Sequence, residues 1–315
     1  MPYKQGMKPK EFSDIQKSAA QTAFNDYTVA FPPPSTSGGL IDGTLCLPTG
    51  PVTGKALFLH GIESHRDGGH DIAKKTAFYL AARGIASLRI DFCGHGTRKD
   101  EWQKFSPWHM VREALTSIDY LDQEIPAISK TALLGISMGG AAATMIAGYD
   151  DRISALSLLF PVLSYRFTFL EPTSPWGMEF FTKEKLAACI ERNENFSLYE
   201  HKYTGHVLKE CKEIADQGDI PLYLDAALIK KVPVSIVHGT NDQFVNCGVS
   251  QALRKTRPAV HLTLCKDMPH WVSGTWEKPV IDALSTGITN PPLQPVRVKT
   301  LRILDCKNLP LSSIP

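Results

Sequence analysis

At 315 residues, the chain is long enough for one large α/β domain or two smaller domains with a sizeable buried core. Its formal net charge of +2 is almost balanced, which argues against a nucleic-acid or membrane-surface partner. The seven cysteines are an odd number without a C-x-x-C pair, which favours reduced thiols over a disulfide framework or a zinc site. No apolar run has the length of a signal peptide or a membrane span, so we expect a cytoplasmic protein.

Apolar runs alternate with helical segments through the first half of the chain. Residues 1–25 are polar and lysine-rich, and we interpret them as an N-terminal arm. The expected strands cover residues 27–31, 40–47, 55–60, 85–91, 131–134 and 155–160, and the expected helices cover 71–83, 107–123 and 141–147. Strands and helices that alternate in this way predict a parallel, doubly wound sheet.

The alternation stops at Pro161 and resumes near residue 230. Residues 161–229 are rich in aromatic side chains, with helices expected over 183–191 and 205–216, and we interpret them as an inserted lid. The core of residues 26–160 continues over residues 230–290, with strands expected at 232–238 and 260–265 and helices at 249–255 and 276–285. Residues 291–315 form a C-terminal extension to which the sequence assigns no role.

One motif, Gly135-Ile136-Ser137-Met138-Gly139, lies between an apolar run and a run of small helix-forming residues. A strand, G-x-S-x-G and a helix in this order predict a nucleophile elbow. The sharp turn would leave Ser137 at its tip, while the two glycines relieve crowding around it. The N-terminus of the following helix would direct N–H groups and the positive end of the helix dipole at the site, which favours a developing oxyanion.

A serine nucleophile needs a base, usually a histidine that a carboxylate orients. On scaffolds with this elbow the chain order is nucleophile, acid, histidine, which leaves His261 and His270 as candidate bases. His261 lies at the start of a strand, whereas His270 follows its carboxyl end, where ligand sites of parallel sheets form, so we predict His270. The acid is predicted at Asp242, after the preceding strand. Asp267 is the alternative, although it lies only three residues before His270.

An oxyanion hole needs two backbone donors aimed at the tetrahedral intermediate. The N–H of Met138, directly after the nucleophile, is the first candidate. The second is the N–H of Ile62, in the loop that follows His60-Gly61.

Four residues are predicted to contact the substrate. They are His60, Gly61, Trp176 and Trp271. For His60 we favour a structural role, in which its ring supports the loop by hydrogen bonding, and His95 is interpreted as a turn residue that supports the elbow. Most lid aromatics are expected to pack the lid onto the core, and any that reach the site would favour aryl or hydrophobic acyl groups.

Five motifs in this order resemble those of the α/β-hydrolase superfamily. They are His60-Gly61, residues 91–96, the elbow, residues 238–242 and Pro269-His270. Residues 40–287 are similar to the serine esterase branch that includes feruloyl (cinnamoyl) esterases. The resemblance implies an eight-stranded, mostly parallel sheet flanked by helices, a Ser137–Asp242–His270 triad, an acyl-enzyme mechanism and no cofactor or metal. The lid, the stretch 63–67 and both terminal extensions are not explained by that branch.

We therefore predict a serine hydrolase that cleaves carboxylic esters of small molecules. A thioesterase or acyltransferase acting on a carrier-bound or secondary-metabolite acyl group would need the same triad and is an alternative, as are a serine peptidase and a carbon–carbon bond hydrolase. A non-catalytic binding protein on a hydrolase scaffold is a further alternative, but such proteins usually lose a triad member. The sequence leaves assembly into a homo-oligomer open.

Overall fold

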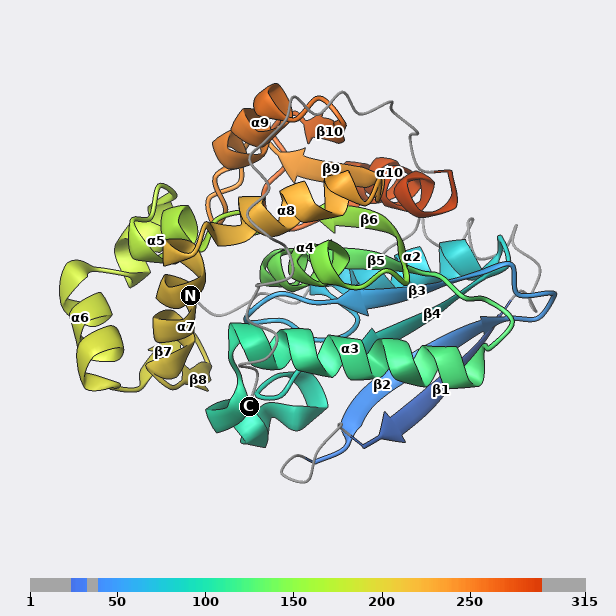
Figure 1. Cartoon of the computed structure of the whole chain (residues 1–315), viewed down its shortest axis with the longest axis horizontal. Coiled ribbons are helices and arrows are strands. Elements are labelled where there is room, and N and C mark those ends of the chain that lie inside the picture. Colours follow the sequence, from blue (N-terminus) through green and yellow to red (C-terminus); the bar gives the residue numbers. More distant parts are fainter. Residues whose placement is uncertain (1–23, 33–38, 291–315) are drawn as a thin grey trace.

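The computed structural model describes residues 24–32 and 39–290 (Figure 1). The predicted N-terminal arm up to residue 23 and the C-terminal extension lie outside the described residues. Within the described ranges, no helix is long and apolar enough to cross a membrane.

An eight-stranded, mostly parallel sheet forms the centre of the fold. Its strands are β1 (Phe24–Phe31), β2 (Ile41–Pro48), β3 (Gly54–Leu59), β4 (Ile85–Ile90), β5 (Thr131–Ile136), β6 (Ile153–Leu159), β9 (Val234–Gly239) and β10 (Val260–Cys265). Their order is β1-β2-β4-β3-β5-β6-β9-β10; β1 and β2 pair antiparallel with their neighbours, and the other strands are parallel to one another. β5 is buried at all six positions, which explains its continuous apolar sequence.

Helices cover both faces of this sheet (Figure 1). α2 (Ile72–Ala81) and α10 (Glu277–Thr289) bury their apolar sides in one cluster, and α3 (Pro107–Glu124), α4 (Met138–Tyr149), α8 (Asp219–Ile229) and α9 (Cys247–Thr256) share the other. The start of α3 shows how the sequence sets a helix boundary. Ser106 Oγ accepts a hydrogen bond from the N–H of His109 at 3.3 Å, and Pro107 follows at a position where its missing N–H is not needed.

The lid begins where β6 ends and returns to the sheet through α8. It contains η3 (Arg166–Leu170), α5 (Pro175–Phe180), α6 (Lys183–Arg192), the hairpin strands β7 (Phe196–Leu198) and β8 (His201–Tyr203), and α7 (His206–Asp216). In Figure 1, α5, α6 and the hairpin lie to one side of the sheet, whereas α8 packs against α4. We propose that the part of the lid outside the core layers ends before α8, because this helix forms the crossover between β6 and β9.

Three short helical segments connect the larger elements. They are η1 (Gly69–Asp71), η2 (Gly96–Lys104) and η4 (Gly274–Trp276). The first two lie in the loops that follow β3 and β4, at the carboxyl ends of the parallel strands, where β5 also ends. The loops at this edge surround the predicted nucleophile.

Candidate active site

Ser137 occupies the tip of the turn between β5 and α4, with a positive φ of 53°. A non-glycine residue in such a conformation costs on the order of 1–3 kcal/mol, so surrounding bonds must hold it. The Ser137 N–H donates to the carbonyl of Leu159 at 3.0 Å, and the Ser137 carbonyl accepts from the N–H groups of Gly140 and Val162, each at 2.9 Å. The turn is therefore anchored to β6 and to the first residues of the lid.

Two close approaches explain the glycines near this serine. A Cβ atom on Gly139 would lie 2.1 Å from the carbonyl oxygen of Leu59, and one on Gly61 would lie 2.7 Å from Ser137 Cβ. Only a residue without a side chain fits at either place. The elbow helix thus packs directly on the end of β3, and the loop after β3 passes directly beside the nucleophile.

The structure brings Ser137, His270 and Asp242 together from three loops. His270 Nε2 lies 3.2 Å from Ser137 Oγ, and His270 Nδ1 lies 2.7 Å from Asp242 Oδ2. All three side chains are buried. The alternative acid, Asp267, is exposed, and its backbone N–H donates to Thr240 Oγ1 at 2.8 Å. Asp242 is therefore the carboxylate that contacts the histidine.

A second buried histidine also contacts Asp242. His238 Nε2 lies 3.3 Å from Asp242 Oδ2, and the other carboxylate oxygen accepts the N–H groups of Phe244 and Val245 at 2.8 and 2.9 Å. Burial alone would raise the pKa of Asp242, but His270 and the hydrogen bonds from both histidines outweigh it and hold the pKa well below its usual range. His238 has no role that the sequence alone predicts, although its place four residues before Asp242, at the end of a strand, is a signal for this contact.

His60 lies beneath the loop that contains Ile62. Its Nε2 accepts the N–H of Phe92 at 3.0 Å, so Nδ1 carries the proton and donates to the Gly61 carbonyl at 2.7 Å. Burial lowers the pKa of His60 to about 4, which keeps the ring neutral. The Gly61 carbonyl and the Ile62 N–H belong to the same peptide unit, so His60 fixes the direction of that N–H.

A cavity of about 920 Å³ opens beside Ser137 and His270. Its apolar wall includes Ile72, Phe160, Val162, Phe169, Trp176, Phe244, Val245 and Val272, and its polar wall includes Glu63, Ser64, Glu200 and His201. Three of the four predicted substrate residues, Gly61, Trp176 and Trp271, line this cavity. His60 does not, because its ring is 2% exposed and both its nitrogens are engaged by backbone groups. The structure thus supports the structural role of His60 rather than a substrate contact.

The backbone N–H groups of Ile62 and Met138 flank the nucleophile. Neither donates a hydrogen bond to another of the residues that the structure describes. Ile62 lines the cavity next to Gly61, and Met138 is the first residue of α4. These two N–H groups therefore belong to segments that adjoin Ser137, and neither has an acceptor among the described residues.

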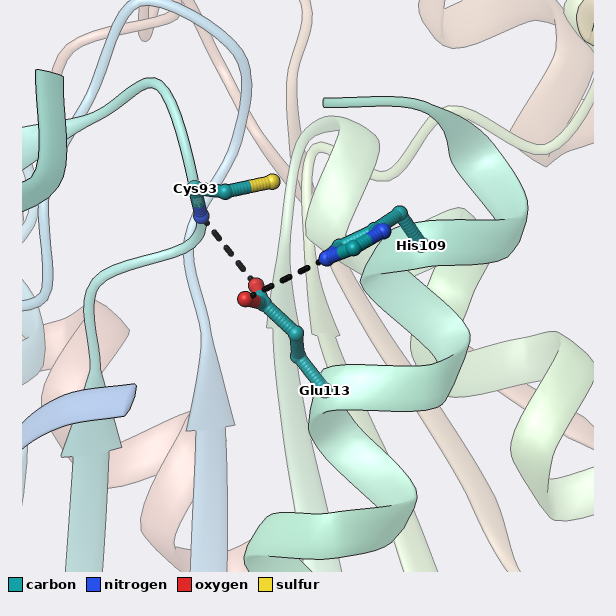
Figure 2. Close-up of side chains that lie close together, drawn as sticks. All are labelled: Cys93, His109 and Glu113. Atoms are coloured by element: carbon teal, nitrogen blue, oxygen red, sulfur yellow. Dashed lines mark hydrogen bonds and ion pairs between the residues drawn. The ribbon is translucent and has the colours of Figure 1, made fainter. Parts of the chain in front are cut away.

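Cys93, His109 and Glu113 bring metal-ligating atoms together, with Cys93 and Glu113 buried and His109 half-buried, and Figure 2 shows the Cys93 N–H and the His109 ring both directed at the Glu113 carboxylate. Glu113 Oε1 is paired with the Arg98 guanidinium at 2.6 Å, and Oε2 accepts the Cys93 N–H at 3.1 Å. Burial raises the pKa of the Cys93 thiol well above its ordinary value, so it is not the thiolate that a metal prefers. An arginine on the carboxylate and a protonated thiol do not fit a cation, and we assign this set to fixing the 91–96 turn on α3.

A mostly parallel sheet of this order, with a serine elbow after β5 and a histidine after the last strand, defines an α/β hydrolase. Residues 50–272 match the family described as serine aminopeptidase, S33 (Hydrolase_4), and the chain belongs to this family. No curated protein sequence matches the chain.

Solved esterase structures share the fold. Est1E from Butyrivibrio proteoclasticus has a TM-score of 0.60 at 19% identity, covering 82% of this chain and 96% of that chain. Its structure with ferulic acid bound has a TM-score of 0.59 at 19% identity, covering 78% and 93%. An esterase from Pyrococcus furiosus has a TM-score of 0.56 at 16% identity, covering 90% and 96%. At these identities the likeness shows the fold alone, and it confirms the predicted α/β-hydrolase fold.

Proposed function

We propose that this protein is a serine hydrolase that cleaves carboxylic esters through an acyl-enzyme intermediate. A single chain of hydrogen bonds supports this function: Ser137 Oγ to His270 Nε2 at 3.2 Å, and His270 Nδ1 to Asp242 Oδ2 at 2.7 Å, at the wall of a cavity. A serine hydroxyl becomes nucleophilic when a histidine that a carboxylate orients takes its proton.

In this mechanism, Ser137 Oγ attacks the ester carbonyl while His270 Nε2 takes the hydroxyl proton. The N–H groups of Ile62 and Met138 stabilise the oxyanion that forms. His270 then gives the proton to the leaving alcohol as the bond from carbon to alcohol oxygen breaks, which leaves the acyl group on Ser137. Water repeats both steps and releases the acid.

We propose aryl or hydrophobic acyl groups as the acyl part of the substrate. The ring of Phe244 lies 5.1 Å from that of His270 and 5.5 Å from that of Trp176, so the reacting centre is next to aromatic faces. Such a wall favours a planar, apolar group over a charged one. Ferulic acid, which the related Est1E structure holds, is an aryl acid and provides a first compound to test.

The family description names an aminopeptidase, whose substrate carries a free amine, and two acidic residues line the cavity. Both carboxylate oxygens of Glu63 are engaged, one by the Tyr203 hydroxyl at 2.6 Å and the other by His201 at 3.0 Å. Glu200 is exposed, where one charge interacts weakly with an amine. For this reason we propose ester hydrolysis ahead of aminopeptide hydrolysis.

The proposal is tested by turnover of p-nitrophenyl acetate, butyrate and octanoate, methyl ferulate and an aminoacyl p-nitroanilide. We expect ester hydrolysis by the wild type, and a loss of roughly 10⁴-fold or more in kcat for Ser137→Ala. Ser197→Ala is the matched control, since Ser197 is an exposed serine on β7.

Labelling with a fluorophosphonate distinguishes the alternatives. Labelling at Ser137 without turnover of any ester would favour acyl transfer to a dedicated acceptor, and preferential anilide cleavage would favour a peptidase. A wild-type protein that neither labels nor turns over any substrate would exclude a serine hydrolase.

A further inference from the structure

The residue after Ile62 contacts the lid hairpin. Glu63 has a positive φ of 59°, and both oxygens of its carboxylate meet side chains of β8. The Tyr203 hydroxyl donates to Oε1 at 2.6 Å, and His201 Nδ1 lies 3.0 Å from Oε2. This carboxylate raises the pKa of His201, which strengthens the pair by keeping the imidazole protonated over a wider range.

The backbone of Glu63 is held as well. Its N–H donates to His95 Nε2 at 3.3 Å, and His95 Nδ1 donates to the Cys93 carbonyl at 3.1 Å. Burial lowers the pKa of His95 well below its ordinary value, so Nε2 stays free of a proton and serves as an acceptor. His95 Nε2 also lies 3.1 Å from the Tyr203 hydroxyl, so the single Tyr203 proton has two acceptors within reach, and the shorter contact is with Glu63 Oε1.

The hairpin packs Phe196, Leu198 and Tyr203 into the interior, and His201 is half-buried. Tyr203 is fully buried, and its ring lies 5.5 Å from Phe105 and 5.3 Å from Phe196. The rings of His201 and His95 stack at 5.0 Å. The hairpin therefore presents Tyr203 and His201 to Glu63 from a rigid support, although it belongs to the inserted lid.

We propose that Glu63 is a positioning residue that makes the lid hairpin part of the oxyanion hole: β8 holds Glu63 through Tyr203 and His201, and Glu63 holds the peptide unit next to the Ile62 N–H. This role rests on the proposed function of Ser137. The physical basis is strain, because a non-glycine residue at positive φ relaxes when its anchors are removed. A small displacement of an oxyanion donor is enough to lower turnover strongly, since the donor must meet charge that develops only in the transition state.

The test compares Tyr203→Phe, Glu63→Ala and the double variant with the wild type on p-nitrophenyl butyrate. We expect kcat to fall by at least about tenfold in each single variant, while KM stays within about twofold, because the loss is confined to the transition state. The double variant should lose little more than Glu63→Ala, as the two residues act through one contact. Lys202→Gln is the matched control, since Lys202 is exposed on the same strand between His201 and Tyr203.

Thermal unfolding of each variant separates a folding defect from a positioning defect. Should Glu63→Ala fail to fold, Glu63→Gln takes its place, because the amide oxygen still accepts from Tyr203 but the His201 ion pair is lost. An active wild type with kcat unchanged in folded Tyr203→Phe and Glu63 variants would overturn the positioning role alone. A wild type that the fluorophosphonate does not label would instead overturn the function on which that role rests.

Discussion

His238 Nε2 lies 3.3 Å from Oδ2 of Asp242, the same carboxylate oxygen that His270 contacts at 2.7 Å. His238 is fully buried, and its Nδ1 meets the Ser250 hydroxyl at 2.8 Å. When the serine donates to Nδ1, the proton of the ring sits on Nε2, which lies 3.1 Å from the Val245 carbonyl oxygen and 3.3 Å from the carboxylate. The contact therefore supports both the ionisation and the orientation of Asp242.

Replacement of His238 by phenylalanine should lower kcat/KM while keeping a ring in the same buried position. Phe keeps a ring but has no donor, and a hydrogen bond to a charged group contributes about 1.5–3 kcal/mol, so we expect kcat/KM to fall roughly 10- to 100-fold. Ser250→Ala keeps His238 and should cost much less. Steady-state kinetics with a thermal unfolding check would measure both; an unchanged kcat/KM in folded His238→Phe would contradict the role.

Asp242→Asn is expected to lower kcat by about 10³- to 10⁴-fold, because an amide no longer fixes the correct tautomer of His270.

The Asp242→Asn substitution should also change how the free energy of unfolding depends on pH. The pKa of Asp242 is held below its usual range in the folded chain, so the wild-type carboxylate contributes stability that is present above its unfolded pKa of about 4 and lost as pH falls through the folded value. Urea unfolding of wild type and variant between pH 5 and 3, the range in which this loss begins, would show a flatter dependence in the variant.

Much of this architecture could be predicted because its elements are long and regular. The strand over Val260–Cys265 has the predicted bounds, and α3 extends only one residue beyond its predicted end. The elbow and the chain order of nucleophile, acid and histidine likewise depend on local patterns. The ends of parallel strands lie along one edge of a sheet, which is why Ser137, Asp242 and His270 were expected to meet.

The contacts missed from the sequence have weak or distant signals. Tyr203 and Glu63 are 140 residues apart in the sequence. The hairpin that carries Tyr203 has strands of only three residues, which are too short for a detectable alternation of apolar and polar residues. α8 was not predicted, since its run of consecutive apolar residues gives no helical period. Its helical form follows from packing between layers, which no local pattern records.

Because His60 is buried in its neutral form, we expect the protein to lose stability in mild acid. Burial lowers the pKa of His60 to about 4, against about 6.5 in an unfolded chain, so the unfolded state binds the proton first. Stability is therefore complete above about pH 6.5 and falls as pH approaches 4, by up to roughly 3 kcal/mol from this group. His95, whose pKa burial also lowers, acts in the same direction.

Urea unfolding at pH 7 and pH 4.5 measures this loss. In His60→Gln the amide can still accept from the Phe92 N–H but does not titrate. The free energy of unfolding should therefore fall much less between pH 7 and pH 4.5 in this variant than in the wild type. If wild type and His60→Gln lost the same free energy of unfolding between pH 7 and 4.5, His60 would not be the neutral buried group described above.

Trp176→Leu tests whether the aromatic wall selects the acyl group. The Trp176 ring lies 5.3 Å from Phe181 and 5.5 Å from Phe244 and lines the cavity, so leucine would remove the flat surface but leave an apolar one. We expect the ratio of kcat/KM for methyl ferulate to that for p-nitrophenyl acetate to fall about tenfold, equivalent to about 1.4 kcal/mol of lost aryl contact. Trp276→Leu is the control, because Trp276 packs in the apolar cluster of α2 and α10 and does not line the cavity. A ratio that changes equally in both variants would place the acyl group away from Trp176, against another wall of the cavity.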